Sequence, residues 1–134
     1  MYKRQAIGGA VYNEMTGALL TEGANAGADF SIAIGANAEA NGLSSTSLGV
    51  FAVASSDSSI ALGNSADSTA AFAIAIGSDA NAGGIDAIAI GTSSVVTSLG
   101  GIAIGGDGDD NGDATDTTGA RSGCLLYTSP SPRD

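Results

Sequence analysis

The segment AIAIGSDANA at residues 73–82 contains, within ten residues, the pattern that decides the fold. Ile74, Ala75 and Ile76 precede Gly77, and alanines then alternate with polar residues after it. Alternation with a period of two is typical of β-strands, because neighbouring side chains of a strand point to opposite faces. The segment therefore predicts two short strands separated by a turn, with glycine allowing a positive φ or a close backbone approach.

The same pattern returns every 14 residues. Seven glycines mark the period: Gly35, Gly49, Gly63, Gly77, Gly91, Gly105 and Gly119. A fixed period of this kind indicates a repeat architecture. Each repeat would form one coil of an all-β parallel roll, paired with the coils above and below it at about 4.8 Å. A helix is excluded because a glycine inside each helix would cost about 1 kcal/mol, and because the β-branched residues recur at a spacing of two.

Two aliphatic columns flank a column of small residues in every repeat. We expect these aliphatic side chains to form ladders inside the roll, hidden from solvent: Ile32, Ile34, Ile60, Leu62, Ile74, Ile76, Ile88, Ile90, Ile102 and Ile104. The alanine columns after each glycine are expected to let several copies pack side by side, since a roll of 14-residue coils is thin and poorly buried alone. Phe30, Phe51 and Phe72 are expected to fill the roll or the contact between subunits.

The two ends of the chain break the pattern. Met1–Gln5 and Cys124–Asp134 resemble the two strands of a transposase adapter used in sequencing libraries, translated in frame. We therefore expect residues 1–5 and 124–134 to be adapter-derived and the rest to be an internal fragment of a longer protein. Between them we expect a partial or irregular first coil at 6–17, the roll at 18–105, and an acidic Gly/Asp-rich loop or linker at 106–123.

The chain is strongly acidic. Its formal net charge is −10, and Arg121 is the one basic residue outside the two terminal segments. This charge opposes binding to nucleic acid, which requires a basic surface, and docking onto an anionic membrane.

Catalytic chemistry finds little support. The chain has no histidine, and its single cysteine lies in the C-terminal segment, so the usual nucleophile–base pairs cannot be assembled. Asp79 and Asp86 are a conceivable pair of carboxylates, but we interpret them as solvated turn residues on an acidic surface. We predict that the protein is not an enzyme and has no catalytic residues.

The acidic segment leaves a metal site open. Asp107, Asp109 and Asn111, followed by Gly112 and Asp113, match the start of an EF-hand-like calcium loop, in which oxygen ligands alternate along the chain. The bidentate glutamate expected at the twelfth position is Thr118. Calcium binding and a solvated acidic linker both remain possible, and no other cofactor is indicated.

The segment SIAIGANAEA at residues 31–40, which returns at 73–82, resembles the head repeat of YadA-like trimeric autotransporter adhesins. The resemblance implies a left-handed parallel β-roll, with three chains forming one homotrimeric head. It also implies a cell-surface protein, anchored in the outer membrane through a part not present here. Thr46 in an isoleucine column and Thr21 at a glycine position depart from the pattern.

From this resemblance we expect the fragment to mediate attachment to extracellular matrix proteins, host cells or other bacteria through a multivalent surface. Two alternatives remain. One is a phage tail fibre or other surface spike built on the same roll. The other is a calcium-stabilised or ice-binding solenoid that acts as a monomer.

Overall fold

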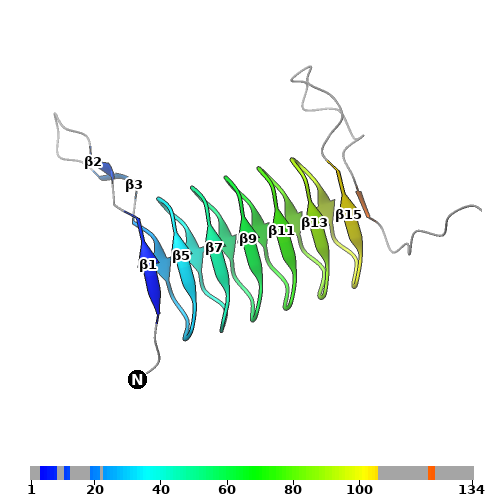
Figure 1. The fold of residues 1–134 in the computed structure, drawn as a ribbon, viewed down its shortest axis with the longest axis horizontal. Coiled ribbons are helices and arrows are strands. Elements are labelled where there is room, and N and C mark those ends of the chain that lie inside the picture. Colours follow the sequence, from blue (N-terminus) through cyan, green and yellow to red (C-terminus); the bar gives the residue numbers. More distant parts are fainter. Residues whose placement is uncertain (1–3, 9–10, 13–18, 22, 106–120, 123–134) are drawn as a thin grey trace, which may run out of the picture.

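The computed structural model describes residues 4–8, 11–12, 19–21, 23–105 and 121–122. Most of these residues form a flattened parallel β-roll with two seven-stranded sheets, one on each broad side (Figure 1), and residues 11–12 and 19–21 form a separate two-stranded sheet. The predicted all-β solenoid with 14-residue coils is confirmed.

The first sheet contains three-residue strands. In spatial order these are β1 (Gln5–Ile7), β5 (Ile32–Ile34), β7 (Thr46–Leu48), β9 (Ile60–Leu62), β11 (Ile74–Ile76), β13 (Ile88–Ile90) and β15 (Ile102–Ile104). The second sheet contains two-residue strands. They are β4 (Asn25–Ala26), β6 (Glu39–Ala40), β8 (Val53–Ala54), β10 (Asp67–Ser68), β12 (Asn81–Ala82), β14 (Val95–Val96) and β16 (Arg121–Ser122).

The register follows the sequence period. Ile74 of β11 pairs with Ile60 on one side and Ile88 on the other, so equivalent residues of successive repeats lie side by side. Backbone hydrogen bonds join the coils, as when the Ile74 N–H donates to the Ala87 carbonyl oxygen at 2.8 Å. Identical side chains therefore form straight rows along the roll.

Two β-turns close each coil. In the first bend the Ala80 N–H donates to the Gly77 carbonyl oxygen, and in the second bend the Ala87 N–H donates to that of Gly84. The third residue of each turn has a positive φ, 56° at Asp79 and 57° at Asp86. A left-handed residue at this position is the feature that defines a type II turn.

The periodic glycines carry the role predicted for them. Gly35 has a φ of 128°, and a Cβ at this position would lie 2.5 Å from the Gly49 carbonyl oxygen. Gly77 is in the same situation against Gly91. Each glycine thus provides both an unusual φ and the space for the next coil to approach.

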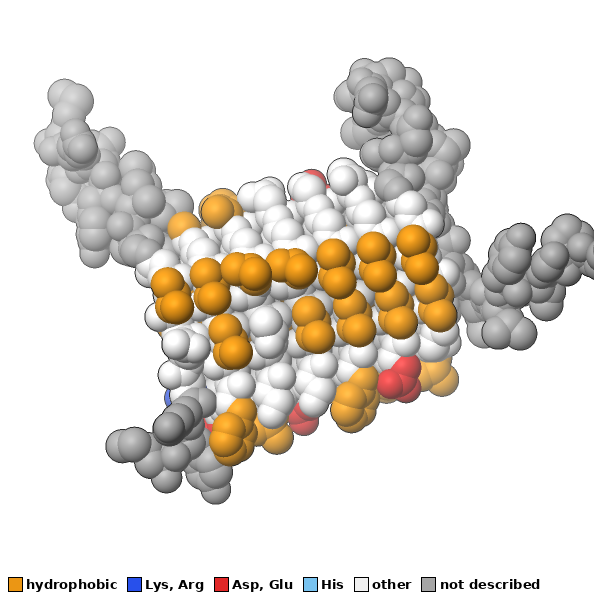
Figure 2. All heavy atoms as spheres, in the orientation of Figure 1, with side chains coloured by type: hydrophobic (Ala, Val, Ile, Leu, Met, Phe, Trp, Pro, Cys, Tyr) orange, Lys and Arg blue, Asp and Glu red, His pale blue; other side chains and the backbone are white. Residues whose placement is uncertain are grey.

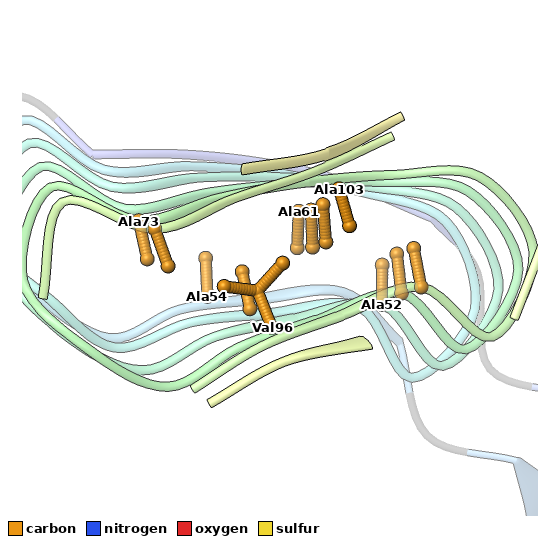
Figure 3. Packing of buried hydrophobic residues seen from close by; sticks show 12 residues of the cluster. Ala52, Ala54, Ala61, Ala73, Val96 and Ala103 are labelled. Atoms are coloured by element: carbon orange, nitrogen blue, oxygen red, sulfur yellow. The ribbon is translucent and has the colours of Figure 1, made fainter. Parts of the chain in front are cut away.

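The interior of the roll is lined by small side chains, and here the prediction was wrong. Ala61, Ala75 and Ala89, the middle residues of their strands, are fully buried, whereas Ile60 remains 37% exposed. Figure 3 shows alanine side chains, among them Ala61, pointing into the space between the two sheets. The aliphatic columns therefore point outward, and the alanine columns expected between subunits lie inside the roll. They include Ala38, Ala52, Ala66, Ala80, Ala40, Ala54 and Ala82, all fully buried.

The reason for this reversal is the thickness of the coil. In an Ile-Ala-Ile strand the middle side chain faces one side and both isoleucines face the other. The opposing sheet lies close enough that methyl groups and one valine, Val96, fill the space between (Figure 3). Two isoleucines from each coil do not fit there, so the alanine turns inward.

The terminal coils depart from the simple period. The roll was predicted over residues 18–105, but within this range Leu19–Thr21 (β3) forms an antiparallel pair with Val11–Tyr12 (β2). Gln5–Ile7, from outside the range, pairs with β5. At the other end Arg121–Ser122, predicted to belong to the acidic linker, pairs with β14 as the last strand of the second sheet. The roll thus extends beyond the range that the repeats mark.

Candidate interaction surfaces

The outer surface of the first sheet carries two continuous rows of aliphatic side chains, named here the aliphatic face. The first row contains Ile32, Thr46, Ile60, Ile74, Ile88 and Ile102, and the second row contains Ile34, Leu48, Leu62, Ile76, Ile90 and Ile104. Figure 2 shows both rows as parallel orange bands across the roll. At about 4.8 Å per coil, each row is roughly 24 Å long.

This face is strongly apolar for a surface. Neither row contains a charged residue, and Leu48 and Leu62 are 39% and 37% exposed. Ile74, Ile76, Ile88 and Ile90 are half-buried, and exposure is greatest in the last strand, with 55% at Ile102 and 70% at Ile104. Contiguous apolar patches of this kind on soluble proteins mark sites of protein or membrane contact.

The second bends form a different surface, named here the bend edge. It carries large apolar side chains that are at least 47% exposed, namely Phe30, Leu43, Phe72, Ile85 and Leu99. Asp29, Asp57 and Asp86 occupy the same two columns of the repeat. Along the lower edge of Figure 2, orange side chains are accordingly interspersed with red ones.

The three phenylalanines occupy unfavourable backbone positions. Phe30, Phe51 and Phe72 have φ values of 58–60°, a region that bulky residues rarely adopt. All three are more than half exposed, so they do not fill the roll, and the alternative that they fill the contact between subunits stays a prediction. Phe30 and Phe72 lie on the bend edge, and Phe51 lies in a first bend on the opposite side. Residues held in such conformations concentrate at functional sites.

The outer face of the second sheet is mixed in character. Asp67 lies between Val53 and Asn81 in neighbouring strands, and its Oδ1 is buried without a hydrogen-bond partner. Burial raises the pKa of the Asp67 carboxyl above its ordinary value of 3.8. The structure thus places an acid where its charged form is poorly solvated.

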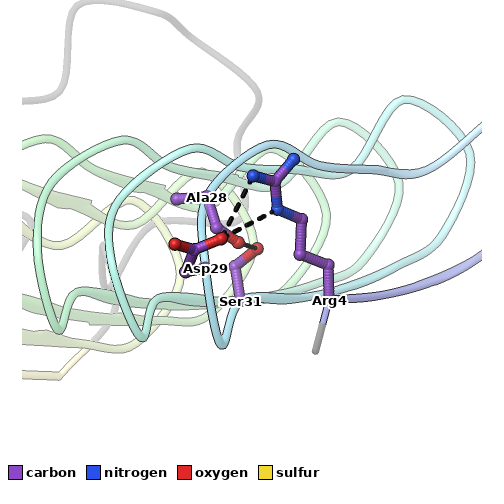
Figure 4. A network of polar contacts seen from close by, with 4 residues as sticks. All are labelled: Arg4, Ala28, Asp29 and Ser31. Carbon is purple, nitrogen blue, oxygen red and sulfur yellow. Dashed lines mark hydrogen bonds and ion pairs between the residues drawn. The ribbon is translucent and has the colours of Figure 1, made fainter. Parts of the chain in front are cut away.

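A small polar network lies near the N-terminal end of the roll (Figure 4). The Arg4 guanidinium forms an ion pair with Asp29 at 3.1 Å, and the Ser31 hydroxyl donates to the Ala28 carbonyl oxygen at 2.5 Å. The ion pair is exposed, and such pairs contribute about 0–1 kcal/mol. Arg4 also belongs to the segment interpreted as adapter-derived, so we assign this network no function.

The carboxylates considered as a catalytic pair are not brought together. Asp79 lies in a first bend and Asp86 in a second bend, on opposite sides of β12. Among the described residues, no group of three or more histidine, cysteine or acidic side chains could hold a metal ion. Asp107, Asp109, Asn111 and Asp113 lie outside the described residues, so calcium binding remains a prediction.

Neither the aliphatic face nor the bend edge was predicted from the sequence. The alternation of isoleucine with alanine showed that the two kinds of residue face opposite sides of the strand. The 14-residue length of the coil could have indicated that the smaller residue faces the interior. The sequence could also have placed Phe30, Phe51 and Phe72 in turns. The equivalent positions of other repeats hold Ser44, Ser58 and Asn37, and serine and asparagine are typical of turns.

Comparison with known protein families identifies the family to which the chain belongs. The family model described as the YadA head domain repeat, which covers two copies of the repeat, matches residues 22–38, 40–66, 54–80, 68–94 and 82–107.

The chain belongs to the YadA head repeat family. YadA head domains are surface-exposed repeats of trimeric autotransporter adhesins, and the family is structural and non-enzymatic. A search of curated proteins found no match. The part of the chain that the structure describes contains no helix of the length and apolarity needed to cross a bilayer.

Proposed function

We propose that this chain is a segment of the head of a trimeric autotransporter adhesin, in which three copies pack through their aliphatic faces. The observation that carries the proposal is the aliphatic face itself, two uncharged rows of partly exposed side chains on a roll whose interior is almost entirely alanine and serine. A roll with so small a core gains little from burial within one chain. Packing three such faces together supplies the missing apolar burial.

Family membership supports the number of copies and the location. The head would be a left-handed homotrimer on the cell surface, anchored in the outer membrane through a part of the protein outside this fragment. Its partners would be an extracellular matrix protein or a cell-surface ligand.

The bend edge is the surface we propose for ligand contact. Its apolar side chains lie in turns at the margin of the roll, away from the two rows of the aliphatic face, so trimerisation would leave them available. Three copies of an edge that repeats along the roll would bind many weak sites at once, and multivalency can increase the apparent affinity by about 10²–10⁴.

Attachment assays test this function. Beads coated with the chain are applied to cultured cells and to surfaces covered with extracellular matrix proteins, and detachment under flow is measured. We expect Phe72→Ser, on the bend edge, to weaken attachment, whereas Phe51→Ser, the same change in an equivalent turn on the opposite side, leaves it largely unchanged. Equal attachment by both variants would exclude the bend edge, and no attachment by the unaltered chain to any surface would count against adhesion.

A further inference from the structure

The regularity of the aliphatic face creates a problem of alignment. Equivalent side chains repeat at every coil, so sliding one roll along another by one coil, about 4.8 Å, restores nearly the same apolar contacts. Patterns without a distinguishing feature specify their register weakly. A homotrimer built on this face needs a feature that separates the aligned arrangement from the shifted ones.

Thr46 is the one polar residue in the two rows between β5 and β15. It lies between Ile32 and Ile60, with which it pairs directly. Its side chain faces outward and is half-buried, and its hydroxyl makes no hydrogen bond to another described residue. Gln5 also occupies this column, at the end of the roll, but belongs to the segment interpreted as adapter-derived.

We propose that Thr46 sets the axial register of the assembled head; this inference rests on the homotrimer proposed above. In the aligned trimer three Thr46 hydroxyls lie at one level, where each can donate to one neighbour and accept from the other. A shift by one coil instead places Thr46 of one copy against Ile32 or Ile60 of the next. The hydroxyl would then be buried against hydrocarbon without a partner, which is unfavourable.

Leu48 and Leu62, which replace isoleucine in the second row, are weaker markers of register. Leucine and isoleucine have the same volume, and exchanges between them are well tolerated in packed interfaces. Single polar residues in otherwise apolar seams are known to specify register in coiled coils at some cost in stability. Thr46 is likewise a single polar residue in an otherwise apolar face.

Cysteine cross-linking between copies measures the register. Two single-cysteine variants, Ile76→Cys and Ile90→Cys in a Cys124→Ser background, are unfolded, mixed, refolded together and oxidised. Peptide masses then give the ratio of cross-links between different positions to those between equal positions, and light scattering on the same sample gives the oligomeric state. With Thr46 present we expect cross-links between equal positions to dominate.

Thr46→Val removes the hydroxyl while keeping the shape, and we expect the share of cross-links between positions 76 and 90 to rise about tenfold. Thr46→Ser keeps the hydroxyl and serves as the matched control, with an unchanged pattern. A second polar level, introduced as Ile60→Thr in the Thr46→Val chain, should restore the aligned pattern. If Thr46 only stabilised its own coil, a threonine at position 60 would not restore the aligned cross-linking pattern.

The outcomes separate the two proposals. A trimer whose cross-linking pattern is the same with Thr46 and with Thr46→Val overturns the role of Thr46 and leaves the trimer intact. A folded chain that is monomeric in the same light-scattering measurement overturns the proposed assembly, and the register inference with it.

Discussion

The interior of the roll and the aliphatic face are built from the same strands and differ in what they bury. Ala75 is fully buried within its own chain, between Ala61 and Ala89, whereas Ile74 and Ile76 on either side of it are only partly covered. The smaller residue thus occupies the closed space and the larger ones face outward. In a coil this thin, the small side chains form the core of the chain, and the proposed assembly would bury the large ones.

The two regions therefore have separable consequences for stability. Changes in the interior row act on the fold of each chain, because the space between the sheets is fixed by the hydrogen-bonded coils. If the proposed trimer forms, changes on the aliphatic face are expected to act on association. Substitutions on one strand can test this separation residue by residue.

The largest effect is expected for Ala75→Asp. The carboxylate would lie in a closed apolar space with no partner, and burying a charge in this way is far more costly than a single domain can tolerate. We expect loss of the β-sheet signal in far-ultraviolet circular dichroism at 25 °C. Ala75→Ser is the matched control, since Ser47 occupies the equivalent position in β7 and is fully buried, and it should keep the fold.

Ile76→Asp, one residue further along the same strand, is expected to break the assembly and spare the roll. A carboxylate on the aliphatic face remains hydrated in the monomer but would lose its water in the trimer. Light scattering should show the monomer mass while circular dichroism keeps its β signal; Ile76→Val should remain assembled. Complete unfolding of Ile76→Asp with Ala75→Asp still folded would reverse our assignment of the two faces.

A smaller and opposite effect is expected at the bends, which belong to neither region. Phe51→Asn places a residue that tolerates positive φ at a position where φ is 58°. We expect stability to increase by about 1 kcal/mol, measured as a higher denaturation midpoint in urea. A decrease in the midpoint would mean that Phe51 makes contacts in the assembled protein that outweigh its backbone strain.

The smallest effect is expected at Asp67, on the outer face of the second sheet. Because burial raises its pKa in the folded state, the folded protein binds this proton more tightly than the unfolded chain. Stability from this group is therefore greatest below about pH 3.8 and falls as the pH rises through the raised pKa. Asp67→Asn should melt at a higher temperature than the unaltered chain at pH 7, and the difference should vanish near pH 3. An equal difference at both values would show that ionisation is not the cause.

Much of the fold could be predicted because it is local and repeated. The spacing of Gly35 and its equivalents gave the coil length, and the alternation around Gly77 gave the two strands and their turn. Which side of a strand turns inward is not encoded by alternation alone. Whether Ile74 or Ala75 faces the interior depends on the distance between the two sheets, which the sequence pattern does not give. The usual preference for large apolar residues in protein cores led to the wrong prediction.

The ends of the roll could not be predicted for a different reason. Gln5–Ile7 and Arg121–Ser122 join the sheets from outside the 14-residue register. Their pairing depends on the open edges that the regular coils leave, and an unpaired strand edge accepts a variety of sequences. The 14-residue period of the sequence therefore does not predict these terminal strands.

The molar mass of the folded chain in solution tests the central claim most directly. Light scattering across a dilution series should give about 38 kDa, three times the 12.8 kDa of one chain, together with the dichroism of a β protein. A stable, folded species at 12.8 kDa across that series would show that the aliphatic face can remain in water, and it would overturn the proposed trimer.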